Sequence, residues 1–393
     1  MNKKGRPVIS SKLGSMKRMI FCLLLFLVLS FSGAWGADVK PLTEYDRLFM
    51  GENGWTGGDG ACSIPLSENR ILWLFGDTLI GSISEGKRGS CVLINNSIAI
   101  QEGIQVEKAA VKFFYPTTSE GKPAAFLRPE DGKGWLWPAH GIRTPKALYL
   151  FLMQMEATGD SSVFGFRHIG SWLAVIKNPD DPPDQWRIAQ KKIPWAVFLP
   201  GKNLFFGASL LRDGKDVYIY GISEESGKDN PSKAMILAKA PEGSLGYFGT
   251  WRFYSGGEWV KDYRDAEDLC PGIATEYSVS LRIQETEGRR QYGEMEKQYI
   301  LITSGNAFSG EILARTAPQP WGPWGKNRLI YRCPEIKGGQ DIFCYAAKAH
   351  PELSGGGGLI ITYAANSTNF ARLTDASLYR PRFLYLALPG FGK

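Results

Sequence analysis

The chain has 393 residues, with 46 Lys and Arg against 39 Asp and Glu, and its formal net charge is +7. Hydrophobic residues make up 44% of the chain, which is too many for a disordered protein, and the 46 Gly lack the every-third-residue period of collagen. A chain of this size can bury a large core, in one all-β domain or in two smaller domains.

The N-terminus has the pattern of a secretory signal peptide. An apolar run over residues 19–31 follows Lys17 and Arg18, and Ala34 and Gly36 occupy the small-residue positions before a cleavage at Ala37. The run is shorter than the roughly 18–20 apolar residues of a membrane-spanning helix. We therefore predict a signal peptide over residues 1–36 and a secreted or periplasmic protein, with an uncleaved membrane anchor as the alternative.

Cleavage would remove six basic side chains and no acidic ones, which lowers the net charge from +7 to +1. The six are Lys3, Lys4, Arg6, Lys12, Lys17 and Arg18. A near-neutral surface without a basic stripe argues against a nucleic-acid partner. We expect a monomer without membrane attachment once the signal peptide is removed.

Five cysteines remain after cleavage: Cys62, Cys91, Cys270, Cys333 and Cys344. Export permits disulfides, but an odd number leaves at least one thiol free, and the spacings match no zinc pattern. The pairs Cys62–Cys91 and Cys333–Cys344 are candidate disulfides, and buried free thiols are the alternative.

One pattern recurs along the chain: a short strand, a tight turn, and a second strand rich in aromatic and aliphatic residues. It covers residues 58–78, 137–154, 204–223, 275–305 and 343–367. Third strands are predicted at 97–101, 172–179, 235–243 and 311–320, and fourth strands at 185–190, 250–259 and 327–332.

Five such repeats, without a long amphipathic helix, predict an all-β fold: a five-bladed β-propeller with four-stranded antiparallel blades, forming a single domain over residues 37–393. A two-sheet sandwich is the alternative, but a period near seventy residues does not suit it. We expect residues 382–388 to form an outer strand that closes the propeller, because an open sheet edge would be a pairing hazard.

Several motifs resemble those of the five-bladed propeller glycoside hydrolases, a group of arabinanases, β-xylosidases and invertases with a less-studied branch that includes endo-D-arabinanases. The motifs are GWTGGDGACSIPL and LWLFGDT near the start, WLWPAHG, GEILARTAPQPWGPW, and AKAHPELSGGGGLIITYAANS near the end. The likeness covers nearly the whole chain after residue 36. It implies a propeller fold and hydrolysis of a polysaccharide or oligosaccharide.

Hairpin geometry places several polar residues at one end of the predicted sheets, because the start of a first strand and the end of a second strand lie together. Asp59 then faces Thr78 with Asp77 beside it, and Glu276 opens the first strand of the fourth repeat. Asn366 is expected opposite Ala347 at the same end. Trp137 reaches this end from the second repeat, with His140 deeper along the strand.

Glycoside hydrolysis needs one carboxylic acid that protonates the leaving oxygen and one carboxylate that activates water or attacks carbon. Crowded acids shift each other's pKa, so that one stays protonated while another is ionised. The resemblance implies that Asp59 is the base or nucleophile and Glu276 the acid. We assign the supporting role to Asp77, although in the better-known families that acid usually comes from the second or third blade, where this chain has WPAHG.

Each of these residues also has a structural interpretation. Asp59 and Asp77 are typical turn residues, and Glu276 could be a solvated strand end. His140 and His350 could be core histidines. We expect no cofactor, and the resemblance to arabinanase-like propellers implies an axial Ca²⁺ held by His140 as the alternative. Trp55 and Trp137, which we predict as substrate-binding residues together with His140 and Asn366, could instead pack between blades, as could Trp135.

The sequence lacks the GxSxG, HExxH and GxxxxGK[ST] motifs of other catalytic classes. We therefore predict an exported propeller glycosidase with an acid/base pair of carboxylates. A non-catalytic propeller that binds carbohydrate or serves as a scaffold is the alternative, because one fold hosts many functions.

Overall fold

The computed structural model describes residues 38–199, 201–225, 232–285, 295–354 and 357–388. The chain divides into two units, Met1–Gly36 and Ala37–Lys393, and the predicted signal peptide lies outside the described residues. Within the described ranges, no helix is long and apolar enough to cross a bilayer. The helices there are α1 (Thr43–Asp46) and the 3₁₀ turns η1 (Arg47–Phe49), η2 (Pro183–Gln185), η3 (Glu242–Ser244), η4 (Phe248–Thr250), η5 (Tyr263–Asp265), η6 (Ala307–Ser309), η7 (Pro334–Gly338), η8 (Pro351–Leu353) and η9 (Phe370–Thr374).

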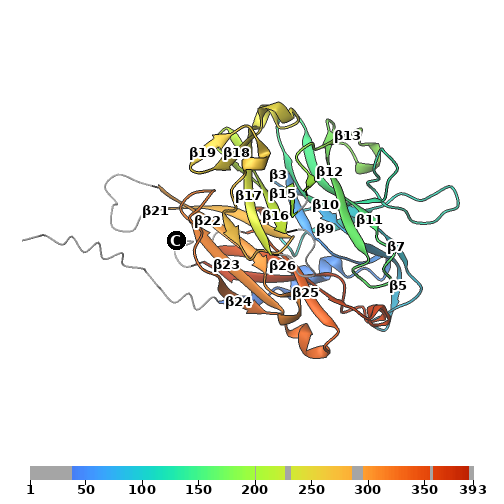
Figure 1. The fold of residues 1–393 in the computed structure, drawn as a ribbon. Coiled ribbons are helices and arrows are strands. Elements are labelled where there is room, and N and C mark those ends of the chain that lie inside the picture. The colour runs from blue at the N-terminus through green and yellow to red at the C-terminus, as the bar shows by residue number, and fades with distance from the viewer. Residues whose placement is uncertain (1–37, 200, 226–231, 286–294, 355–356, 389–393) are drawn as a thin grey trace, which may run out of the picture. The chain divides into compact units, whose positions relative to one another are not determined.

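Each of the five predicted hairpins forms the first two strands of an antiparallel sheet, and the predicted third and fourth strands follow (Figure 1). The sheets are β3 (Cys62–Ser67), β4 (Arg70–Phe75), β8 (Ser97–Glu102) and β9 (Ala110–Phe114); β10 (Trp135–Arg143), β11 (Leu148–Ala157), β12 (Phe166–Ile176) and β13 (Ile188–Lys192); β15 (Lys202–Asp213), β16 (Asp216–Glu225), β17 (Lys233–Pro241) and β18 (Arg252–Ser255); β21 (Tyr277–Glu285), β22 (Met295–Ser304), β23 (Glu311–Ala317) and β24 (Arg328–Arg332); and β25 (Ile342–His350), β26 (Gly358–Ser367), β27 (Pro381–Ala387) and β1 (Val39–Pro41).

The second strands have largely apolar middle segments, and in the first sheet such a segment is buried on both faces. In β4, which reads RILWLF, the side chains from Ile71 to Phe75 are all buried. This continuous apolar pattern is typical of strands in the middle of a layered structure. It explains why the repeat could be read from the sequence.

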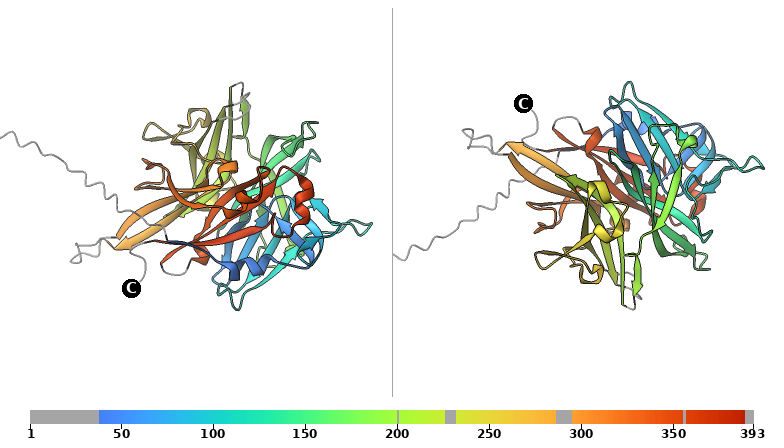
Figure 2. Two further views of the ribbon diagram at one scale, coloured as in Figure 1. Left: turned by 90° about the horizontal axis from the view of Figure 1, so that it is seen from below. Right: turned by 90° about the horizontal axis from the view of Figure 1, so that it is seen from above.

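The first strands β3, β10, β15, β21 and β25 contact one another in a closed cycle. In both views of Figure 2, residues 342–387 lie beside residues 277–332, in agreement with the contacts of β25 with β21 and β22. The cycle closes between β25 and β3, where the Nζ of Lys348 donates to the carbonyl oxygen of Gly60 at 2.6 Å. The starts of the five strands are therefore brought to a common place.

Two features differ from the sequence prediction. The first repeat carries an inserted sheet, formed by β2 (Asn53–Gly58), β5 (Thr78–Ser84), β6 (Lys87–Arg88) and β7 (Val92–Ile94). The third sheet is also extended, by β14 (Val197–Leu199), β19 (Glu258–Val260) and β20 (Cys270–Pro271). These short strands lie before, between and after the main strands and have no strong period of their own.

The prediction that residues 382–388 form the outer strand was wrong. β27 is the third strand of its sheet, and the N-terminal strand β1 pairs with its far edge, with Val39 opposite Leu386. Because β1 covers the edge that β27 would otherwise expose, the last sheet is completed by the first strand of the described chain.

All five described cysteines are free thiols in the structure. Cys333 and Cys344 nevertheless lie close enough for a hydrogen bond between their side chains. The alternative expectation of buried thiols therefore describes four of the five, since Cys91 is partly exposed.

A buried arginine ties the inserted sheet to the segment before β27. Arg88 is 5% exposed and donates five hydrogen bonds to four backbone carbonyl oxygens. The acceptors are Thr56, Leu373, Asp375 and Leu378. This contact fixes the chain immediately before Tyr379, which reaches the candidate site described below.

Substitution Arg88→Ala is expected to lower the free energy of unfolding by about 3 kcal/mol, because it leaves several buried carbonyl groups without donors. Arg88→Lys should recover only part of the loss, since an ammonium cannot reproduce the guanidinium fork. Urea denaturation measures both. Arg128→Ala, at an exposed arginine, is the control, and an equal effect there would contradict the assignment.

Candidate active site

Three carboxylic acids lie together at one end of the sheets: Asp59 and Glu276 before first strands, and Asp77 after the second strand β4. Asp59 precedes β3, and its backbone N–H donates to the carbonyl oxygen of Asp77 at 3.3 Å. Glu276 directly precedes β21, and its Oε1 lies 2.8 Å from the Nζ of Lys348, the same ammonium that contacts Gly60. All three acids are partly exposed, so the structure brings the three predicted catalytic residues to one accessible place.

The backbone around this cluster is strained. Four non-glycine residues in the described part of the chain have positive φ, and three of them border the site: Ala61 (29°), Ala346 (57°) and Tyr379 (58°). Gly76 has no such φ, but a Cβ added there would lie 2.5 Å from Oδ1 of Asp59. Left-handed conformations at residues with a Cβ cost free energy and persist where surrounding contacts impose them, most often at functional sites.

Two tyrosines hold the carboxyl group of Asp59. The hydroxyl groups of Tyr345 and Tyr379 donate to its Oδ2, at 2.6 and 3.3 Å. Asn366 in turn donates from Nδ2 to the Tyr345 hydroxyl oxygen at 3.3 Å. Burial, followed by the nearby carboxyl groups of Asp77 and Glu276, raises the pKa of Asp59 to about 8, although the tyrosine hydrogen bonds oppose the shift.

Asp77 is oriented by two donors to its Oδ1. These are Nε1 of Trp137 at 2.8 Å and Nδ2 of Asn95 at 3.4 Å. Burial raises the pKa of Asp77 to about 6, and the two hydrogen bonds oppose the shift. Two crowded acids with raised pKa values give the site a proton that it can retain near neutral pH.

Lys348 is a buried cation at the centre of the site, with a side chain that is 3% exposed. Burial alone would lower its pKa, but the carboxylate of Glu276 and the nearby Cys62 and Asp59 outweigh burial, and the pKa is raised overall. Buried lysines are rare unless they are paired with an acid. Lys348 therefore acts as the counter-charge of Glu276.

Sequence reasoning did not identify Lys348, Tyr345 or Tyr379. Lys348 could have been identified from the sequence, because a lysine in the middle of the apolar strand FCYAAKAH implies a buried acidic partner. Tyr345 sits on the same strand. No sequence pattern indicated Tyr379, since its position depends on the path of the chain between β26 and β27.

The predicted substrate-binding residues have different outcomes. Trp137 and Asn366 reach the acids through Asp77 and Tyr345. Asn366 pairs with Phe343 and not with Ala347, because the connection between β25 and β26 is centred earlier than the glycine run suggests and a bulge between Tyr345 and Lys348 adds a one-residue shift. His140 lies deeper, with Nδ1 2.9 Å from the carbonyl oxygen of Gly141, and burial and the charge of Lys348 lower its pKa to about 4.

The prediction that Trp55 binds substrate was wrong. Its side chain is 2% exposed and stacks on Phe113 with ring centroids 4.4 Å apart, and Nε1 donates to Oγ of Ser97 at 3.2 Å. Trp55 belongs to β2 of the inserted sheet, which packs it into an aromatic core with Phe49 and Phe75. A ring enclosed in this way cannot stack on a sugar.

The residues near the axis of the five sheets do not fit a calcium ion. Ca²⁺ binds oxygen ligands, mainly carboxylates and carbonyls, whereas the charge that acts on His140 and helps to lower its pKa is the ammonium of Lys348. Among the described residues, no three His, Cys, Asp or Glu side chains are grouped so as to hold a metal. The site's own cation is a lysine.

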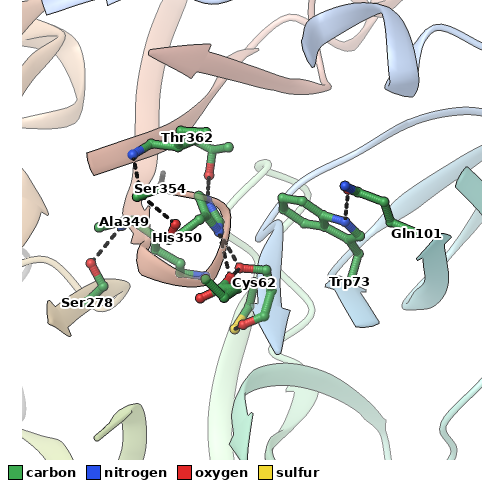
Figure 3. Close-up of polar contacts among 12 residues, drawn as sticks. Cys62, Trp73, Gln101, Ser278, Ala349, His350, Ser354 and Thr362 are labelled. Atoms are coloured by element: carbon green, nitrogen blue, oxygen red, sulfur yellow. Dashed lines mark hydrogen bonds and ion pairs between the residues drawn. The ribbon is translucent and has the colours of Figure 1, made fainter. Parts of the chain in front are cut away.

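A buried polar network joins β3 to β25 and β26 (Figure 3). His350 is fully buried, with Nδ1 2.5 Å from Oγ of Ser63 and Nε2 2.7 Å from Oγ1 of Thr362. Ser63 also donates to Glu352. Burial, followed by the charge of Lys348, lowers the pKa of His350 to about 3, so this histidine is a neutral core residue.

The raised pKa of Asp59 has a stability consequence. The folded state favours the protonated acid, so ionisation of Asp59 disfavours folding progressively from the unfolded pKa near 4 up to the folded value of about 8. Asp59→Asn should therefore raise the melting temperature by about 5 °C at pH 8 and leave it unchanged at pH 3.5. Scanning calorimetry of both proteins across pH measures this, and a difference independent of pH would contradict it.

The ion pair of Lys348 with Glu276 can be tested by a double-mutant cycle. Lys348→Met should lower the free energy of unfolding by about 3 kcal/mol, because Glu276 is left without a counter-charge. Glu276→Gln is measured alone and combined with Lys348→Met. The loss in the double variant should be smaller than the sum of the two single losses, and an equal loss would contradict the ion pair. Lys122→Met, in the exposed pair with Glu120, is the control, with an expected effect below about 0.5 kcal/mol.

Comparison with solved structures shows the fold. An assumed hydrolase from Bacteroides ovatus ATCC 8483 is 21% identical, with 88% of this chain and 90% of that chain covered and a TM-score of 0.65. An endo-arabinase from Bacteroides thetaiotaomicron VPI-5482 is 10% identical, with 86% and 96% covered and a TM-score of 0.45. A GH62 alpha-L-arabinofuranosidase from Coprinopsis cinerea is 9% identical, with 85% and 94% covered and a TM-score of 0.43.

Glycoside hydrolases thus occur among the solved structures that this chain matches, and a shared fold shows nothing about activity. No curated protein matches the sequence. A family model described as "Domain of unknown function (DUF5005)" matches residues 43–387, and the chain therefore belongs to the DUF5005 family.

Proposed function

We propose that the five sheets are the blades of a five-bladed β-propeller and that the three acids lie at one mouth of its axis. The closed cycle of first strands supports this proposal, as does the antiparallel order shared by the five sheets. In such a fold, strand starts from different blades meet around the axis, which is where Asp59 and Glu276 are found.

We propose further that the protein is a glycoside hydrolase that cleaves a polysaccharide or oligosaccharide. The observation that carries this function is the meeting of Asp59, Asp77 and Glu276 in a partly exposed cluster, with two of the pKa values raised. Hydrolysis of a glycosidic bond requires a carboxyl group that holds a proton beside another that does not. This cluster has the groups for both tasks.

The contacts favour an exchange of the two roles that the sequence resemblance implies. Asp59 has a pKa near 8 and retains its proton near neutral pH, as a general acid must. Glu276 is paired with the ammonium of Lys348, as suits a carboxylate that acts as base or nucleophile. Asp77, held by Trp137 and Asn95, keeps the supporting role.

A non-catalytic carbohydrate-binding propeller is the second candidate, and the same ion pair favours it. The buried Lys348 forms an ion pair with Glu276, and a carboxylate held in an ion pair can serve a structural role without taking part in catalysis. For either function we propose export through the signal peptide over residues 1–36 to the periplasm or the medium, and a monomeric state with a carbohydrate as the partner.

The activity can be tested by incubating the purified protein with arabinan, xylan, mannan and fructan and measuring the release of reducing ends. We expect one of these to be cleaved, and Asp59→Asn and Glu276→Gln each to lower kcat by at least about 100-fold. Arg128→Ala should leave kcat unchanged. Binding of a polysaccharide without cleavage would favour the second candidate.

The assignment of roles has its own test. An aryl glycoside with a good leaving group needs little protonation, so the variant that lacks the general acid should retain most of its activity on it. We expect Asp59→Asn to retain that activity and Glu276→Gln to lose it. The opposite result would restore the roles implied by the sequence resemblance.

A further inference from the structure

We propose that two exposed phenylalanines beside the acids, Phe164 and Phe308, form an aromatic platform supported by the buried ring of Phe343, and that this platform binds a neutral sugar residue of the substrate adjacent to the residue held by the acids. This inference rests on the proposed function, because it names a second binding position for the same substrate. The platform draws on three different sheets, and none of its members was singled out by the sequence motifs.

Phe164 is presented by a structured loop between β11 and β12. Asp160 accepts from the backbone N–H of Ser162 at 2.9 Å, and Gly165 donates its N–H to the Ser162 carbonyl oxygen at 3.0 Å. A Cβ at Gly165 would lie 2.0 Å from the Asp160 carbonyl oxygen, so the loop requires glycine there. Phe164 is 54% exposed at its tip.

The loop between β11 and β12 contacts both Trp137, which holds Asp77, and β25, which carries Tyr345. Phe166, at its base, packs edge-on against Trp137 with ring centroids 4.7 Å apart. Phe164 itself contacts Phe343 of β25, with ring centroids 5.9 Å apart. A single loop therefore connects the residue that holds Asp77 with the strand that carries Tyr345.

Phe308 completes the platform from the connection between β22 and β23. Its ring centroid lies 5.6 Å from that of Phe343, and its side chain is 50% exposed. Asn306 orders this turn by accepting from the Phe308 backbone N–H at 3.0 Å. Phe343 in turn lies 5.3 Å from the ring of Tyr345, whose hydroxyl donates to Asp59.

A hollow of about 330 Å³ adjoins Phe308. Its lining combines this apolar ring and two isoleucines with the polar side chains of Lys337 and Gln340. A sugar ring has one apolar C–H face and a rim of hydroxyl groups, so an aromatic face beside hydrogen-bonding side chains is complementary to it. Phe164 and Phe308 both expose about half of their side chains while packing on the buried ring of Phe343. Neighbouring exposed aromatic rings of this kind mark a surface that a ligand covers.

The experiment is native electrophoresis in gels that contain arabinan, xylan, mannan or fructan, in an Asp59→Asn background so that the polymer stays intact. At least one polymer should retard the Asp59→Asn protein. Adding Phe164→Ala or Phe308→Ala should weaken that affinity about three- to tenfold, whereas Phe164→Trp should preserve it. Tyr247→Ala is the matched control, since Tyr247 is 69% exposed but lies beside Lys191.

The outcomes separate the two proposals. If the parent hydrolyses a polymer, Phe164→Ala should raise KM with kcat unchanged, because the platform binds the ground state and the transition state alike. Retardation that Phe164→Ala and Phe308→Ala weaken, with no hydrolysis by the parent, would support the platform and refute the hydrolase. Hydrolysis with unchanged KM and unchanged retardation in both Ala variants would refute the platform alone, and so would the absence of retardation by every polymer.

Discussion

The contact between Lys348 and its two acceptors determines much of this structure. Its ammonium joins the carbonyl oxygen beside Asp59 to the carboxylate of Glu276, at the place where the cycle of first strands closes. A buried charge demands a partner, so the same interaction that unites the last sheet with the first also fixes the separation of two acids. The contact that closes the cycle of first strands therefore also brings the acids of the site together.

The site is maintained at a cost to the fold. Asp59 is held where burial and two neighbouring acids disfavour its ionised form, and three residues around it have left-handed backbone conformations. Such strain is stable only because contacts elsewhere supply the free energy. Arg88, which anchors the segment before Tyr379, and the polar network of His350, which links β3 to β25 and β26, are two of these contacts.

The repeat was predictable because each hairpin pairs residues close in sequence and buries both faces, so hydrophobic pattern and turn residues indicate the same strands. Hairpin geometry indicated that Asp59, Asp77 and Glu276 lie at one end of the sheets, and the family resemblance supplied their expected roles. The inserted sheet, the bulge beside Lys348 and the role of Tyr379 depend on contacts between distant segments, which no local pattern encodes. Trp55 shows the limit best, because one aromatic residue suits a core and a sugar equally well until its neighbours are known.

The pairing of β1 with β27 also constrains how the molecule is made. The last sheet needs strands from both ends of the chain, so it cannot be completed until β27 has been synthesised and delivered. During synthesis from the N-terminus, β1 has no pairing partner until β27 has been made. A chain truncated before β27 therefore lacks the strand that pairs with β1.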